Sequence, residues 1–227
     1  MAVSPVDSTG ISPLMDDWEA RELIRRLRKH AGMTYAAEAG ISLRDAPMPL
    51  FQLLVLCMLA SKPIEASIAM RAAKELFHAG LRTPNAVLAA ERSTVIKAFG
   101  RAHYVRYDES SASRLTDLAT RVDKDYRGDL RLLARLAKPE VRGAKLLLKQ
   151  FNGIGDTGAD IFLREVQDVW PWVRPYFDKR ALDTAGELGL PRDAGKLAVL
   201  TGRTVAPLAA GLVRVALDDA LRHDVIG

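Results

Sequence analysis

The sequence predicts an all-α fold in which two helical lobes are separated by a cleft. Ten segments repeat apolar side chains every three or four residues, a spacing typical of helices, and no clear strand pattern lies between them. Glycine and proline, which favour helix ends, separate these segments. The 227 residues suffice for one large domain or two small lobes, and 48% of them are hydrophobic, which can support a core. The boundary between the lobes is left open.

The expected helices follow one another along almost the whole chain. They cover residues 16–30, 49–60, 64–79, 84–99, 110–122, 130–137, 144–151, 156–167, 179–188 and 205–222. Breaks are expected at Gly32, Gly40, Pro47, Pro49, Gly100 and Gly128, and across residues 80–84, 153–155, 171–175 and 189–191. Residues 1–15 lack the basic start and apolar centre of a signal peptide and are expected to form a flexible tail. Residues 16–227 would then form the helical fold.

Cysteine and histidine usage argues against metal and disulfide chemistry. Cys57 is the only cysteine, so one chain can form neither a disulfide framework nor a multi-cysteine zinc or iron–sulfur site. The four histidines lack metal-ligand spacing, and no metal cofactor is expected. The longest apolar run, residues 50–60, contains Gln52 and is too short to cross a bilayer. We therefore expect a soluble, cytoplasmic, monomeric protein that does not bind membranes.

A glycine-rich turn lies near the middle of residues 144–168. Gly153 and Gly155 flank Ile154, and glycine permits both positive φ and the close approach of another backbone. Amide groups at the start of the following helix would be available to bind phosphate. The segment therefore predicts a helix, a hairpin and a second helix that can hold a nucleic-acid backbone. An ordinary corner between two helices, with glycine at the C-cap, fits the same spacing.

Positive charge is concentrated directly before this turn. The chain has a formal net charge of +5, and residues 121–149 contain nine Lys or Arg against four Asp or Glu. The excess in this stretch equals that of the whole chain, which favours a polyanion as the partner. The alternative is a solvated helix face formed by the basic side chains of Arg131, Arg135, Lys138, Arg142, Lys145 and Lys149.

Residues 48–221 resemble the helix-hairpin-helix (HhH-GPD) DNA glycosylases, which include endonuclease III and the alkylpurine glycosylases. The family signature is an apolar residue, Pro, Gly, an apolar residue, Gly, two variable positions, Thr and Ala, with a catalytic Asp further along the chain. The matching positions are Phe151, Gly153, Ile154, Gly155 and Ala159, the departures are Asn152 and Gly158, and Asp178 stands at the place of the aspartate. Because no cysteines follow the last helices, the resemblance is to members without an iron–sulfur cluster.

The resemblance implies a base excision repair glycosylase that cleaves the N-glycosidic bond of a damaged or mismatched base flipped out of duplex DNA. Its catalytic residue would be Asp178, whose carboxylate could stabilise the oxocarbenium-like transition state and orient the attacking water. A simpler role for Asp178 is the N-cap of the helix at 179–188. Thr157 stands where bifunctional members carry the lysine that forms a Schiff base, so we expect a monofunctional enzyme that lacks lyase activity.

The DNA backbone would be held by the turn and by two lysines before it. The residues expected to contact it are Lys145, Lys149, Gly153, Ile154, Gly155, Thr157 and Gly158. Family members often hold a monovalent cation, Na or K, with backbone carbonyls of this turn, and the candidates are the carbonyls of Phe151, Gly153 and Ile154. Asp156 suits the start of a helix, but its negative charge would weaken the binding of a phosphate placed nearby.

Aromatic residues and one lysine are candidates for handling the flipped base. Trp172 and Tyr176 lie in a proline-containing loop and could wall a base pocket, although packing in the core explains them equally well. Tyr104 and Tyr107 stand where relatives place residues that probe the minor groove or a strand, and the alternative is a pair of exposed loop tyrosines. Lys62 aligns with a position from which relatives insert a wedge into the gap left by the flipped nucleotide, and the alternative is a simple surface lysine.

Two other functions remain open. The altered residues Asn152 and Gly158, and the missing lysine at Thr157, fit a non-catalytic DNA-binding protein that retains this fold. A helical interaction protein unrelated to DNA is the third hypothesis. Double-stranded DNA is the expected partner under the first two, and it would place the protein at the nucleoid.

Overall fold

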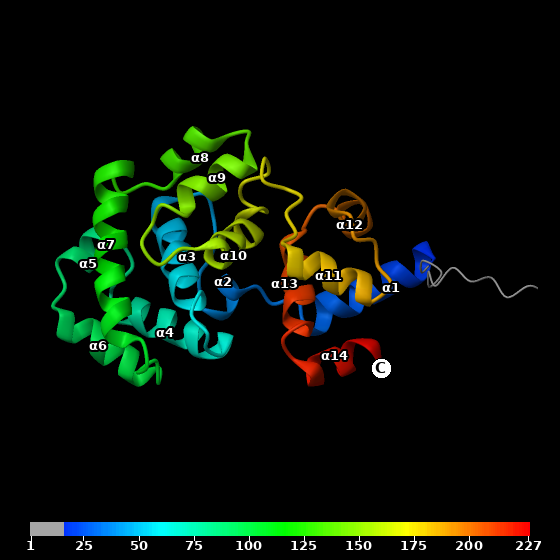
Figure 1. Cartoon of the computed structure of the whole chain (residues 1–227), viewed down its shortest axis with the longest axis horizontal. Coiled ribbons are helices and arrows are strands. Elements are labelled where there is room, and N and C mark those ends of the chain that lie inside the picture. The colour runs from blue at the N-terminus through cyan, green and yellow to red at the C-terminus, as the bar shows by residue number, and fades with distance from the viewer. Residues whose placement is uncertain (1–15) are drawn as a thin grey trace, which may run out of the picture.

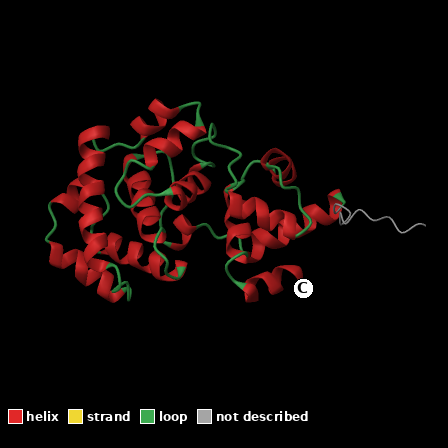
Figure 2. Cartoon of the chain, viewed as in Figure 1, coloured by secondary structure: helices red, strands yellow, loops and turns green. Residues whose placement is uncertain are grey.

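A computed structural model describes residues 16–227, which form fourteen α-helices and contain no strand (Figures 1 and 2). The prediction of an all-α fold is confirmed. The expected flexible tail, residues 1–15, lies outside the described residues.

The helices build two hydrophobic cores, which lie in different parts of the molecule (Figure 1). The first core defines what we call the first lobe, whose helices are α2 (Tyr35–Glu38), α3 (Pro47–Ala60), α4 (Ala66–His78), α5 (Pro84–Leu88), α6 (Arg92–Arg101), α7 (Asp108–Tyr126), α8 (Arg131–Ala137), α9 (Val141–Leu148) and α10 (Asp156–Val166). The second core defines the second lobe, whose helices are α1 (Asp17–His30), α11 (Lys179–Glu187), α12 (Ala194–Thr201), α13 (Ala206–Val215) and α14 (Asp219–Ile226).

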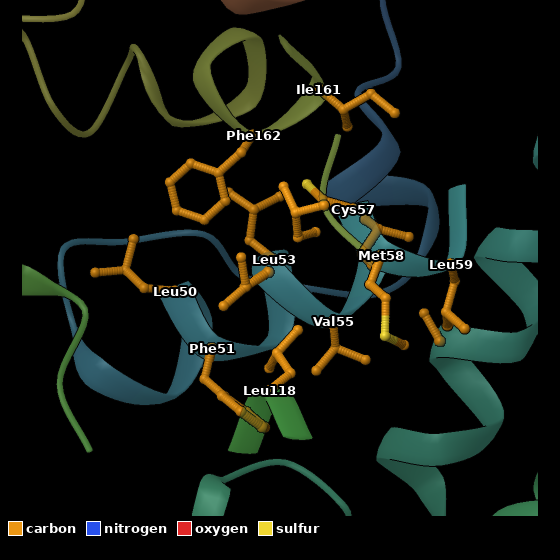
Figure 3. Packing of buried hydrophobic residues seen from close by; sticks show 14 of the residues in the cluster. Leu50, Phe51, Leu53, Val55, Cys57, Met58, Leu59, Leu118, Ile161 and Phe162 are labelled. Carbon is orange, nitrogen blue, oxygen red and sulfur yellow. The ribbon is translucent and has the colours of Figure 1, made fainter. Parts of the chain in front are cut away.

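Helix α3 is the centre of the first lobe because it is apolar on all sides. Figure 3 shows its side chains packed with Leu118 of α7 and with Ile161 and Phe162 of α10. Full burial of each such Leu, Val or Phe side chain stabilises the fold by about 1.5–3 kcal/mol. Among the described residues no single helix is long and apolar enough to cross a membrane, although α12 and α13 meet that test as a pair bent by 114°.

Helix α1 joins the second lobe, so this lobe combines the first described helix with the last four. Its apolar face buries Leu23, Ile24 and Leu27, while its other faces are charged. A capping box starts the helix: the Glu19 amide donates to the Asp16 side chain at 2.8 Å, and the Asp16 amide donates to the Glu19 side chain at 3.3 Å. The α1 start expected from the sequence is therefore confirmed to within one residue.

Carboxylates on and just after α10 cap helices in both lobes. Glu165 accepts hydrogen bonds from the amides of Tyr35 at 3.2 Å and Ala36 at 2.8 Å, at the start of α2. Asp168 accepts hydrogen bonds from the amides of Val205 at 3.0 Å and Ala206 at 3.2 Å, at the start of α13. These bonds span up to 130 residues of sequence and fix α10 between the lobes.

Some expected helix boundaries are wrong. The single helix expected at 84–99 is divided into α5 and α6, and the one expected at 205–222 is divided into α13 and α14. Neither break contains glycine or proline; α14 restarts at Asp218, whose side chain accepts a hydrogen bond from the Leu221 amide at 2.9 Å. Helices α2 and α12 were not expected from the sequence, and α2, with four residues, is too short for an apolar repeat to be recognised.

Candidate functional site

A cleft of about 910 Å³ lies between the two lobes. Its walls include Tyr35 of α2, residues at the C-terminal end of α3, Arg164 of α10, and Asp178 at the start of α11. A second hollow of about 560 Å³ surrounds the turn between α9 and α10. Ser61, Lys62 and Thr157 line both hollows, so the two hollows are neighbours.

The turn between α9 and α10 has the backbone geometry for which its glycines are suited. Gly153 has φ +91°, a conformation that L residues with a side chain rarely adopt. The Ile154 amide donates a hydrogen bond to the Phe151 carbonyl at 3.0 Å, and both of these side chains are buried. Gly155 is exposed, and a Cβ atom there would meet nothing within 4 Å. The turn is thus anchored by its apolar residues and leaves the backbone at Gly155 open.

Gly158 has a packing role, which corrects the expectation that it contacts DNA. It is buried, and an added Cβ atom would lie 2.5 Å from Oγ of Ser61 and 3.4 Å from the Cys57 carbonyl. The Ser61 hydroxyl itself donates to the Cys57 carbonyl at 2.6 Å. A side chain at this position would have to displace the Ser61 hydroxyl, because α10 passes close to the end of α3.

The two lysines expected to bind DNA lie beside the turn, but each is already paired with a carboxylate. Lys149 Nζ is 2.9 Å from Asp156, and Lys145 Nζ is 2.5 Å from Asp160 and 3.7 Å from Asp156. The hydrogen bond from Lys149 lowers the pKa of Asp156 and keeps this exposed carboxylate ionised. A phosphate at the turn would therefore compete with Asp156 for the two ammonium groups.

Asp178 is the N-cap of α11, so the simpler role considered for it is confirmed. Its Oδ1 accepts a hydrogen bond from the Ala181 amide at 3.0 Å. Its Oδ2 accepts a hydrogen bond of 2.5 Å from Nη1 of Arg164. Asp178 is 9% exposed and lines the cleft, and Arg164 is 3% exposed. Both carboxylate oxygens are thus held by the protein at the floor of the cleft.

Arg164 and Tyr35 were not anticipated as parts of this site. Burial lowers the pKa of the Arg164 guanidinium, but the charges of Asp178 and Glu165 outweigh it, so the pKa is raised. The Tyr35 ring lies between two guanidinium groups, with Arg164 at 5.4 Å and Arg214 at 4.9 Å from its centroid. Two adjacent charged residues, Arg164 and Glu165, within the apolar face of α10 were a signal that could have identified the buried ion pair.

Trp172 and Tyr176 are not among the residues that line the cleft, and their expected place in a base pocket stays a prediction. Trp172 stacks on buried Trp170 with ring centroids 5.8 Å apart, and both belong to the first core. Tyr176 is half-buried and its hydroxyl donates to Asp160, which does line the cleft. Burial, reinforced by Asp160, raises the pKa of Tyr176. The alternative of core packing therefore describes these two residues better.

The remaining candidates for contact with a flipped base differ in burial: Tyr104 is buried, whereas Tyr107 and Lys62 are partly exposed. Tyr104 is 2% exposed and its hydroxyl lies 3.1 Å from that of Ser111, so the expectation that it probes DNA is wrong. Tyr107 is half-buried, and Lys62 Nζ lies 5.7 Å from the centroid of its ring. Lys62 lines both hollows, so it stands where the turn meets the cleft.

Few groups among the described residues could hold a metal ion or a monovalent cation. Residues 16–227 contain no cluster of three or more His, Cys, Asp or Glu side chains placed to hold a metal ion. The Phe151 carbonyl accepts the Ile154 amide with one of its two lone pairs, so the carbonyls of Phe151, Gly153 and Ile154 all stay candidates for a monovalent cation. Cys57 is fully buried, and burial raises the pKa of its thiol well above the ordinary value.

Comparison of the chain with protein-family models, with curated proteins and with solved structures gives no match. The turn, the cleft and the buried ion pair are the features of this chain that bear on its function.

Proposed function

We propose that this protein is a monofunctional DNA glycosylase of the helix-hairpin-helix type, which acts in base excision repair on a flipped base of duplex DNA. The observation that carries the proposal is that the two hollows lie side by side and share Ser61, Lys62 and Thr157 in their walls. A DNA strand held at the turn between α9 and α10 would pass Lys62 on its way to Asp178. An enzyme that acts on a base in a duplex must extrude that base into a pocket, and the cleft has the volume to receive it.

The turn supports the binding of a phosphate. No side chain caps the start of α10, so the first amides of this helix can donate to an anion. The positive end of the helix dipole adds attraction there. The open backbone at Gly155 lets a phosphate approach without meeting a side chain. Such contacts are independent of DNA sequence, so they would position a duplex without selecting the base.

Asp178 supports the chemistry. Cleavage of an N-glycosidic bond builds positive charge on the sugar, and a carboxylate fixed at the floor of the cleft stabilises that charge. Arg164 and the Ala181 amide would hold the carboxylate in one orientation. Thr157 cannot form a Schiff base with the sugar, so water is the nucleophile and the product is an abasic site.

The proposal is tested by single-turnover base release from duplexes that carry alkylated, oxidised, deaminated or mismatched bases, with and without alkaline treatment. We expect strand breaks only after alkali, and loss of release in Asp178→Asn with lesion binding retained. Asp183→Asn is the matched control because Asp183 also lines the cleft from α11 and should leave release unchanged. Equal release by Asp178→Asn would contradict the role of Asp178, and nicking that borohydride traps covalently would contradict a monofunctional enzyme.

A non-catalytic DNA-binding protein is the second candidate function. It is favoured by one observation: both oxygens of Asp178 are engaged by Arg164 and the Ala181 amide, which offsets the negative charge that catalysis needs. Duplex binding that weakens steeply with salt, without release of any base, would support this candidate. Affinity for duplex DNA that is absent or unchanged across salt concentrations would contradict both candidates and favour a helical interaction protein.

A further inference from the structure

A second cavity, separate from the cleft, lies at the opposite end of α3. It has a volume of about 310 Å³ and is lined by Met48, Pro49 and Gln52 of α3, together with residues near α2 and at the end of α4. The cleft reaches α3 at its other end, at Ala60. Because α3 has 14 residues, the two sites are separated by about 20 Å along the helix axis.

The charge of this cavity is of one sign. Arg44, Lys74, His78 and Arg82 line it, and none of its lining residues is Asp or Glu. No ion pair within residues 16–227 involves any of the four, whereas Lys145 and Lys149 beside the turn are both paired. Three permanent cations around a small cavity repel one another, and a bound anion would remove that repulsion.

Two neutral features of the cavity also favour a polar anionic ligand. Gln52 is 7% exposed, and its side-chain amide makes no hydrogen bond within the described part of the chain. Its amide atoms are not fully buried, so they are available to form hydrogen bonds with a ligand in the cavity. The N-terminal end of α3 also borders the cavity, and no side chain caps it, so the helix dipole adds attraction for negative charge.

We propose that this cavity binds a small phosphate-bearing molecule. Arg44, Lys74 and Arg82 would hold the phosphate, and Gln52 would form hydrogen bonds with the remainder of the ligand. The Nε atom of Arg82 donates to the Phe77 carbonyl at 2.8 Å, which orients its guanidinium group. The volume lies at the lower end of the range of about 300–1,000 Å³ for small-molecule sites, which suits a ligand no larger than a mononucleotide. The proposal does not depend on DNA glycosylase activity.

Isothermal titration calorimetry of the full chain with pyrophosphate and with AMP, at constant ionic strength, tests the site. We expect saturable binding at one site, weakened about tenfold by Arg44→Ala and by Lys74→Ala, since each removes one charge-assisted contact. Lys97→Ala is the matched control, because Lys97 is exposed and lies outside the cavity. Gln52→Leu should weaken AMP binding more than pyrophosphate binding, because the amide would contact the nucleoside part.

Two outcomes would overturn the proposal. The first is no saturable binding of either probe, or equal affinity in Arg44→Ala, Lys74→Ala and Lys97→Ala, with thermal unfolding showing that all three variants are folded. The second concerns the source of the phosphate. If a 5′-phosphorylated duplex displaces AMP and its 5′-hydroxyl counterpart does not, the site belongs to a DNA end and not to a small molecule.

Discussion

Arg164 Nη1 donates a hydrogen bond of 2.5 Å to Oδ2 of Asp178, and both residues are almost fully buried. The pair joins α10 to α11 and therefore connects the two lobes. Any change to the candidate catalytic carboxylate is then also a change to the contact between the lobes. Activity and stability of variants at this pair have to be measured together.

Removing Arg164 should destabilise the protein strongly. Arg164→Met leaves the Asp178 carboxylate buried without its counter-charge, and we expect a loss of about 3–5 kcal/mol in the free energy of unfolding. Urea denaturation of Arg164→Met, Asp178→Asn and the double variant gives the coupling between the two side chains. Arg180→Met is the control, since this exposed arginine of the same cleft should change stability by less than about 0.5 kcal/mol. Additive effects of the two changes would contradict the coupling.

The two glycines of the turn should respond differently to alanine. Gly153→Ala forces a side chain into the left-handed region at φ +91°, and we expect it to cost about 1–2 kcal/mol of stability. Gly155 has extended backbone and open space around its Cβ position, so Gly155→Ala should leave stability unchanged. If a phosphate docks there, Gly155→Ala should nevertheless weaken duplex binding, measured by fluorescence anisotropy. Unchanged affinity in this variant would place the DNA elsewhere.

Restoring a side chain at Gly158 should destabilise the contact between α10 and α3. An alanine Cβ would lie 2.5 Å from Oγ of Ser61, and we expect a cost of about 1–3 kcal/mol in thermal or urea unfolding. Ser61→Ala removes the clashing oxygen, so the combined variant should recover part of that loss relative to Ser61→Ala alone. An equal cost in both backgrounds would show that another contact is responsible.

Removing the charge of Asp156 should strengthen duplex binding. Asp156→Asn takes a negative charge away from the turn and releases Lys149 from its carboxylate partner, while Lys145 keeps Asp160, so affinity should rise about two- to fivefold at low salt. The affinity of this variant for duplex DNA should also fall more steeply with salt concentration than that of the unchanged protein, because binding releases more ions. Asp183→Asn is the control. It removes one negative charge from the cleft, at a residue far from the turn in sequence, so its gain in duplex affinity should be smaller. Weaker binding by Asp156→Asn would contradict contact between the turn and DNA.

The hydroxyl of Tyr176 should contribute stability that is lost at alkaline pH. Tyr176→Phe removes its hydrogen bond to Asp160, which we expect to cost about 1.5–3 kcal/mol at neutral pH. The pKa of Tyr176 is raised above its ordinary value of 10.0, so this contribution is complete below pH 10 and falls as the pH rises through the folded-state value. Urea denaturation from pH 8 to 11 should show the difference between the two proteins shrinking at the alkaline end. A constant difference would mean that the pKa of Tyr176 is the same in the folded and the unfolded chain.

Local patterns predicted most of the helices and one part of the site. The apolar run in α3, the glycines of the turn and the N-cap position of Asp178 are all properties of neighbouring residues, so the sequence alone indicated them. The divisions between α5 and α6 and between α13 and α14 were missed because a polar side chain or tertiary packing ends each helix without glycine or proline. Propensity is too weak to locate such breaks.

Contacts between distant segments could not be predicted from a single sequence. The pairing of Arg164 with Asp178 depends on how α10 and α11 dock, and the bonds from Glu165 to Tyr35 and Ala36 join residues about 130 positions apart. Tyr104 is likewise buried by packing in the first core, although its sequence position allowed an exposed loop. Spacing motifs identify which residues can do chemistry, whereas the cleft that gathers them is a product of the whole fold.

The position of α1 has a consequence for the order in which the protein folds during synthesis. Helix α1 leaves the ribosome before all other described helices, yet it packs against α12, α13 and α14, which leave last. The first lobe is continuous in sequence and can fold as a unit while the chain is still growing. During that time Leu23, Ile24 and Leu27 have no partner, so a nascent chain that stalls before α13 would present them to chaperones and to other unfinished chains.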